Sequence, residues 1–265
     1  MITDISSTET LVDDILVRGM PMLISGSRLT LKTSVGLDLA ISLASGTAFL
    51  DNFAVERPFK TLFLGDGDQA SSSFRKSKTF WNLRKPKANA TKDLMDQSNF
   101  CIDSEVPRPG DNNGLEKLVT FCKRKRFEVV VMDPTYIFME DRESSEIQGE
   151  HYGMLCRMFC EVGITPVLLH SNYSVPDVSE SAPPSFFDSL EPEFNLIARQ
   201  WLFLSRRQAY QHDGIHRLWF EAGSNDGRCQ RKQLTINEGS KPSYNSDPRS
   251  GRGTWTPTLE SLAAA

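Results

Sequence analysis

The stretch ISGSRLTLKTS, residues 24–34, is the part of the chain that most clearly indicates a fold. It continues the apolar run at 22–25 and leads into helical periodicity, so that a turn starting with glycine joins a short strand to a helix. In such a turn several backbone N–H groups point into one concavity, and the helix N-terminus adds partial positive charge. The stretch therefore predicts a phosphate-binding loop made of Gly26, Ser27, Arg28, Leu29, Thr30, Leu31, Lys32, Thr33 and Ser34.

Lys32 and Thr33 are the residues of this loop that bear chemistry. A lysine here reaches the β- and γ-phosphates of a nucleotide, and the threonine hydroxyl binds Mg²⁺. The pattern G-x-x-x-x-G-K-[ST] is met except that Leu31 replaces the second glycine. One imperfect match also arises by chance, so the loop alone leaves open a plain strand-loop-helix with an exposed lysine.

Short apolar runs alternate with helical periodicity from residue 20 to residue 170. This alternation predicts an α/β fold with a mostly parallel central sheet flanked by helices. The expected parallel strands are 22–25, 61–64, 129–132 and 165–169. The expected helices are 32–45, 72–83, 115–126 and 150–162, and Gly46 is expected to end the first of them.

The chain changes in style after residue 169. Residues 172–193 are rich in proline, serine and acids, and they contain no Lys or Arg, which indicates a long surface loop. Strands are expected again at 195–205, 216–222 and 233–236, antiparallel at the sheet edge. We expect one domain over residues 1–240, followed by a poorly ordered tail over 241–265.

Polar side chains follow three of the expected strands, at the edge where α/β proteins bind ligands. Asp133 ends an apolar strand and is a candidate Mg²⁺ ligand, the alternative being a helix-capping aspartate. Asp66 and Asp68 are candidates to polarise an attacking water, the alternative being a glycine-rich turn with solvated acids. His170 is either a sensor of the γ-phosphate or a structural histidine.

Composition limits the classes of protein that the chain can represent. The 265 residues carry a formal charge of −4, so nucleic acid would have to bind through a local patch or through assembly. The five cysteines show no C-x-x-C pair, which argues against structural zinc and disulfides. No apolar run reaches about 18 residues, and the N-terminus does not have the pattern of a signal peptide. We therefore expect a cytoplasmic protein with no membrane contact.

Taken together, several segments resemble a known family. Residues 26–53, 129–134, 197–207 and 216–221, with the strand that ends at His170, resemble the RecA-like AAA-type ATPases of the RepA replicative-helicase group. The likeness spans roughly residues 15–240. It implies a RecA core that binds ATP with Mg²⁺ and a homo-oligomer, commonly a hexameric ring.

The resemblance also implies roles for individual residues. Lys32 and Thr33 would hold phosphates and Mg²⁺, and Asp133 would be the Mg²⁺-binding acid of the Walker B strand. His170 would be the sensor, and Arg199 or Arg206 the arginine that reaches the nucleotide of a neighbouring subunit.

The sequence departs from this family at two positions of the site. Relatives usually carry glutamate after the second strand, whereas this chain has Gly65-Asp66-Gly67-Asp68. Relatives often have two histidines at the fourth strand, and here Ser171 follows His170. Because aspartate is one methylene shorter than glutamate, we expect hydrolysis to be slow or stimulated by a partner.

Charge is unfavourable for direct gripping of DNA by the two loops that follow the third and fourth strands. Residues 140–150 contain Arg142 against five acids, and residues 172–193 contain no base. Modest basic patches remain at 123–126, where a solvated helix end is the alternative, and in the tail, at Arg249, Arg252 and Trp255. The loop 172–193 is expected to bind a protein partner or to gate the nucleotide site, with Phe186 and Phe187 as apolar anchors, the alternative being a disordered loop without a role.

Two functions follow from the sequence. The first is an ATP-hydrolysing RecA-like motor, helicase-like, or an assembly ATPase in DNA replication, mobile-element or defence processes. The second is a nucleotide-binding scaffold that no longer hydrolyses ATP and associates with a protein partner under nucleotide control.

Overall fold

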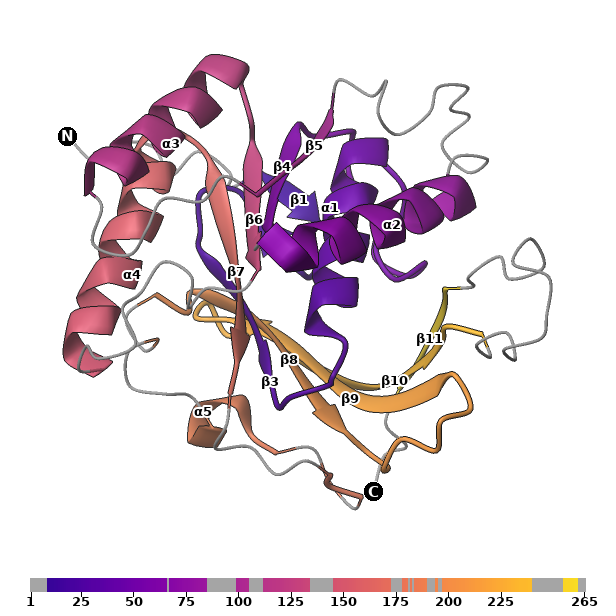
Figure 1. Cartoon of the computed structure of the whole chain (residues 1–265). Helices are drawn as coiled ribbons and strands as arrows, with labels where there is room; N and C mark the ends of the chain where they lie inside the picture. The colour runs from indigo at the N-terminus through magenta and orange to yellow at the C-terminus, as the bar shows by residue number, and fades with distance from the viewer. Residues whose placement is uncertain are drawn as a thin grey trace.

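The fold is built around one large β-sheet (Figure 1). The computed structural model of the chain describes residues 9–65, 67–84, 99–104, 112–133, 145–172, 178–180, 182, 184–189, 194, 197–239 and 255–261. Within these residues the sheet has nine strands in the order β11-β10-β9-β8-β3-β7-β6-β4-β5. A separate antiparallel pair, β1 (Thr10–Val12) and β2 (Leu16–Val17), lies at the N-terminus.

The strands from β8 to β5 are parallel to one another. They are β8 (Gln200–Arg206), β3 (Met22–Gly26), β7 (Thr165–Ser171), β6 (Val129–Asp133), β4 (Thr61–Gly65) and β5 (Phe100–Asp103). Beyond β8 the sheet continues antiparallel through β9 (Ile215–Ser224), β10 (Cys229–Asn237) and β11 (Thr256–Ser261). This is the mostly parallel sheet with an antiparallel C-terminal part that the sequence predicts.

Helices cover both faces of the parallel strands, as Figure 1 shows. Successive side chains of a strand point to opposite faces. On β4, Phe63 therefore packs in the cluster that contains α1 residues, while Leu62 and Leu64 pack with residues of α3 and α4. The helices are α1 (Lys32–Ser45), α2 (Gly67–Arg84), α3 (Asn112–Lys125), α4 (Ser145–Glu161) and the short α5 (Phe186–Ser189).

The central strands and the first helix are confirmed almost residue for residue. β3, β4, β6 and β7 contain the expected runs, and α1 begins at Lys32 and ends at Ser45 as predicted. Gly46 follows α1 with φ of 69°, and a Cβ there would lie 3.0 Å from the ring of Pro58. Glycine is thus required at this position by both its conformation and its surroundings.

Other boundaries differ from the prediction. α2, α3 and α4 begin five, three and five residues before the starts expected at 72, 115 and 150. The strand expected at 195–205 begins only at Gln200, because Ile197 and Ala198 pack in the α3–α4 cluster before the chain enters the sheet. The short strands β1, β2 and β5 were not predicted.

The C-terminal tail contributes a strand that its composition did not reveal. β11 pairs with β10 from Thr256 to Ser261, within the segment 241–265 that we expected to be poorly ordered. Trp255, 7% exposed, packs its ring 4.6 Å from that of Phe80 on α2. Trp255 is therefore a core residue rather than part of a surface patch, while Arg249 and Arg252 lie outside the described residues.

The two phenylalanines expected to anchor a partner have different surroundings. Phe186 is buried, and its ring stacks on Trp201 of β8 at 4.9 Å with an interplanar angle of 3°. Phe187 is 60% exposed. Phe186 thus belongs to the core of its own chain, and of the pair Phe187 is the one accessible to a partner.

A buried ion pair fixes α2 against α1. The Arg84 guanidinium donates to the Asp38 carboxylate and to the carbonyl of Ala48, the latter at 2.7 Å. The other carboxylate oxygen of Asp38 accepts from the Leu50 amide at 2.9 Å. Because both charges are buried, each depends on the other for compensation.

We predict that Arg84→Met lowers the free energy of unfolding by about 3–5 kcal/mol, since it leaves the Asp38 carboxylate buried without its cation. Urea unfolding measures the change. Arg75→Met, on the exposed side of the same helix, is the matched control and should change the value by less than about 0.5 kcal/mol. Equal stability of the two variants would contradict the assignment.

Candidate functional site

The loop between β3 and α1 lies at the carboxyl edge of the parallel strands. β3 is flanked by β7 and β8, and Gly26 at its end pairs with Ser171 and Leu204. Asp133 ends β6, which is the next strand beyond β7. Chain segments far apart in the sequence thus bring their polar ends together around this loop.

The backbone of the loop adopts conformations that leucine rarely adopts. Leu29 and Leu31 have φ of 62° and 63°, in the left-handed region, which costs roughly 1–2 kcal/mol for a residue other than glycine. A Cβ on Gly26 would lie 2.0 Å from the carbonyl oxygen of Leu204, so that no other residue fits there. The missing second glycine of the motif is therefore a left-handed leucine, and the turn is retained.

Lys32 is buried inside this loop. Its Nζ donates to the carbonyl oxygens of Gly26 at 3.0 Å and Ser27 at 2.6 Å. Burial lowers the pKa of the ammonium group to about 8, which nearby Arg28 favours and Asp133 opposes. The alternative of an exposed surface lysine is therefore wrong, because 8% of this residue is exposed.

Thr33 and Asp133 offer oxygen ligands beside the lysine. Burial raises the pKa of Asp133, while a hydrogen bond from the Thr33 hydroxyl and the charges of Lys32 and Lys76 lower it. Among the described residues, Asp133 Oδ2 and Ser27 Oγ are buried and have no hydrogen-bond partner. A hydroxyl and a carboxylate with an open oxygen fit Mg²⁺, which prefers one or two carboxylates together with phosphate oxygens.

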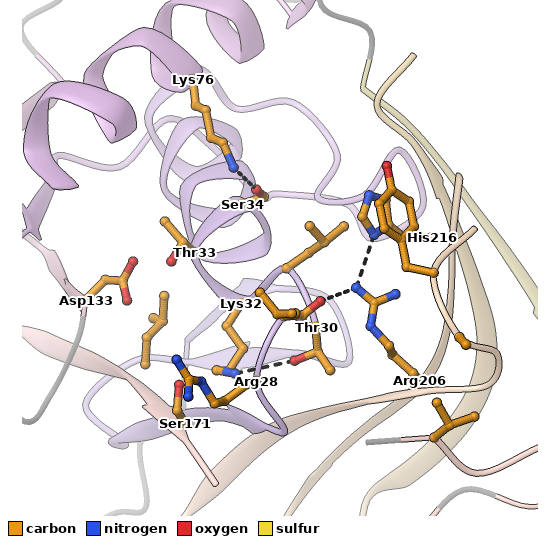
Figure 2. A pocket seen from close by; sticks show the side chains of 16 residues that line it. Arg28, Thr30, Lys32, Thr33, Ser34, Lys76, Asp133, Ser171, Arg206 and His216 are labelled. Carbon is orange, nitrogen blue, oxygen red and sulfur yellow. Dashed lines mark hydrogen bonds between the residues drawn. The ribbon is translucent and has the colours of Figure 1, made fainter. Parts of the chain in front are cut away.

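These groups line a cavity of about 840 Å³. Figure 2 shows Thr33 and Asp133 on one side of the loop and Arg206 with His216 on the other, while Lys76 reaches in from α2. Lys76 donates to the Ser34 hydroxyl at 2.8 Å. The cavity has the size of sites that hold a drug-sized or nucleotide-sized ligand.

The two candidate arginines lie at opposite ends of β8. Arg206 ends the strand and donates to the Leu29 carbonyl of the phosphate loop in the same chain. Its guanidinium lies 5.6 Å from the ring centre of Tyr210. Arg199 precedes the strand, is exposed, and borders a different cavity near Pro21 and Cys156. The structure therefore brings Arg206, and not Arg199, to the phosphate loop.

The remaining candidate residues are not all at the cavity. His170 packs its ring 4.2 Å from that of Phe194, and the next residue, Ser171, lines the cavity instead. Asp66 lies outside the described residues. Asp68 belongs to α2, and its side chain is not among those described.

Four cavity residues with polar side chains were missed by sequence reasoning, namely Lys76, Ser171, Tyr210 and His216. Alternation along β7 indicates that either residue 170 or residue 171 faces α1, and it does not indicate which one. Tyr210 lies in the turn between β8 and β9, and His216 lies at the start of β9, so a hairpin assignment would have placed them close to Arg206.

A comparison with known protein families identifies the family to which the chain belongs. A family model described as AAA domain matches residues 2–170, more than half of the chain. The chain belongs to this AAA domain family. A search of curated proteins found no match.

The AAA domain makes the chain a nucleotide-binding protein of the RecA-like P-loop ATPases. The matched residues include the phosphate loop and Asp133 and end at His170, so Arg206 and the β8–β9 turn lie beyond the match. No helix in the described part of the AAA protein is long and apolar enough to span a membrane.

We predict that Arg206→Ala weakens ATP binding by about tenfold, because the strained loop loses a charged hydrogen bond to the Leu29 carbonyl. Calorimetric titration measures the affinity, and hydrogen exchange of the amides of residues 28–33 should become faster. Arg228→Ala, on the β9–β10 turn and outside the cavity lining, is the control and should leave both quantities unchanged. If both substitutions weakened ATP binding equally, Arg206 would have no specific role at the phosphate loop of its own subunit.

Proposed function

We propose that this AAA domain binds and hydrolyses ATP as a helicase-like motor or an assembly ATPase that works on DNA in replication, mobile-element or defence processes. The observation that supports ATP hydrolysis is the convergence of Lys32, Thr33 and Asp133, with an open Asp133 oxygen, at one cavity. A helix N-terminus that follows a glycine-led loop binds anions such as phosphate. Buried ionisable groups with shifted pKa values, such as Lys32 and Asp133, are typical of functional sites.

Each residue of the site has a defined task in this proposal. Lys32 exchanges the carbonyls of Gly26 and Ser27 for phosphate oxygens. Thr33 and Asp133 would hold Mg²⁺, which would neutralise charge on the phosphates. Arg28 supplies further positive charge at the cavity wall.

The acid that would activate water is assigned to Asp66 or Asp68. Gly65, which ends β4, pairs with Asp133 at the end of β6, and α2 begins at Gly67. An aspartate reaches less far than a glutamate. We therefore propose slow hydrolysis that a partner accelerates.

The second candidate is a scaffold that binds nucleotide without hydrolysing it. The observation that favours it is the hold of Lys32 on its own loop, since binding must break these hydrogen bonds and so couples nucleotide to a change of loop conformation. Such a change suits nucleotide-gated association with a protein partner, for which the exposed Phe187 in the loop 172–193 is a candidate contact.

Oligomerisation is part of the proposal. A homo-oligomer, hexameric as in the family that the sequence resembles, would place an exposed arginine of one subunit at the nucleotide of the next. Because Arg206 is engaged with its own loop, the exposed Arg199 is the better candidate for this action. Of the two neighbouring residues of β7, Ser171 lines the cavity and His170 does not. A sensing role of His170 would therefore have to act through the backbone of β7.

We predict that Lys32→Ala reduces ATP affinity at least tenfold, because it removes the cation that neutralises phosphate charge. Asp133→Asn should reduce turnover more than binding, since it removes a negative partner of Mg²⁺. Equilibrium titration with ATP measures the change in affinity, and phosphate release measures the change in turnover.

If both variants hydrolysed ATP at the wild-type rate, the proposal of a phosphate loop with a metal-binding acid would be wrong. Binding without turnover in the wild-type protein, with and without single-stranded DNA, would favour the scaffold.

DNA contact is proposed for the basic run at 123–126, whose four side chains are exposed at the end of α3. We predict that replacing Lys123, Arg124 and Lys125 by serine weakens binding of single-stranded DNA and flattens its salt dependence, because fewer counterions are released. Filter binding between about 50 and 200 mM salt measures both. Arg228→Ser, on the β9–β10 turn, is the control. An unchanged salt slope would assign the run to a solvated helix end.

A further inference from the structure

The two ends of the cavity differ in chemistry. One end carries Thr33, Asp133 and Arg28, whose groups suit phosphate and metal. The other end carries the aromatic rings of Tyr210 and His216. Figure 2 shows His216 beside Arg206. The phosphate chemistry of the proposed function uses only the first end, so the aromatic end needs an account of its own.

The two rings form an ordered stack. Their centres lie 4.4 Å apart with an interplanar angle of 10°. His216 is buried, and its Nε2 lies 3.3 Å from the Glu238 carboxylate, while its Nδ1 lies 3.4 Å from the Arg206 guanidinium. His216 thus lies between Glu238 and Arg206, and its ring stacks on the ring of Tyr210.

Tyr210 is held in position but not buried. Its hydroxyl accepts a hydrogen bond from the Gly214 amide at 3.2 Å, which fixes the ring relative to the β8–β9 turn. The residue is half-buried and lines the cavity, so part of its aromatic surface faces the space beside the phosphate loop. A tyrosine of the hydrophobic core would be buried. A tyrosine that only faced solvent would need neither the stack on His216 nor the hydrogen bond from Gly214.

We propose that Tyr210, supported by His216, is the platform on which the base of a purine nucleoside triphosphate stacks. The inference rests on the proposed function, because it takes the triphosphate to lie at the Lys32 end of the same cavity. Bases bind aromatic side chains through their π-faces, and a larger face gains more contact. Stacking therefore favours purines over pyrimidines.

The same geometry limits how far the site reads the base. Discrimination between adenine and guanine requires hydrogen bonds to the base edge. At the aromatic end the Tyr210 hydroxyl accepts from the Gly214 amide and keeps its own proton to donate, while Arg206 donates to the Leu29 carbonyl. Stacking by itself selects the size of the base and does not distinguish adenine from guanine.

The test compares ligands that share the phosphates but differ in the base. Affinities of ATP, GTP, CTP and inorganic tripolyphosphate, each with Mg²⁺, are measured by calorimetry for the whole chain. For Tyr210→Ala we expect ATP and GTP to bind about tenfold more weakly and tripolyphosphate to bind as it does to the wild type. Tyr210→Phe, which keeps the ring, should restore most of the purine affinity.

His212→Ala is the matched control, because its exposed ring touches Tyr210 at 5.0 Å from outside the cavity lining. It should leave all four affinities unchanged. Thermal unfolding of each variant shows whether the fold is kept.

Three outcomes would overturn the inference: unchanged ATP affinity in Tyr210→Ala, an equal loss for ATP and tripolyphosphate, or CTP binding as tightly as ATP to the wild type. Wild-type protein that binds neither ATP nor tripolyphosphate would overturn the proposed function itself. ATP binding that depends on Lys32 but not on Tyr210 would leave that function standing and remove only the base platform.

Discussion

A buried lysine beside a buried carboxylate is the constraint on which the rest of the site depends. Removing Lys32 and Asp133 from water is unfavourable, and their attraction offsets only part of this cost. The loop compensates by turning the carbonyls of Gly26 and Ser27 toward the ammonium group. The left-handed leucines and the close approach of Gly26 to Leu204 are what allow so short a loop to enclose a charge in this way.

The central part of the fold could be predicted because its physical signals are local. β3, β4 and β6 are buried on both faces, so their sequences are continuous apolar runs that leave little choice of assignment. The edges of the sheet gave weaker signals. β11 is a short strand in a polar tail, and only its pairing with β10 and the packing of Trp255 against Phe80 define it.

The site was predictable where it is contiguous and unpredictable where it is assembled. Lys32, Thr33 and Asp133 stand at strand ends or in a motif, which can be recognised without knowing what lies opposite. Lys76 and Tyr210 reach the cavity because α2 and the β8–β9 turn pack beside the loop, and this depends on contacts between distant segments. The choice between His170 and Ser171 depends on which side of β7 faces α1, and a one-residue shift reverses it.

The order of strands in the sheet differs from their order in the chain, and this has a consequence for how the protein is made. β3 precedes most of the sheet in the chain, yet Met22 pairs with Val167 and Gln200, which are synthesised far later. Contacts of such long sequence separation form late and slowly. A nascent chain that already contains the whole phosphate loop still lacks both neighbours of the strand that carries it. The strand that carries the loop gains its neighbours only when β7 and β8 join the sheet, so nucleotide binding would report that the second half of the chain has docked.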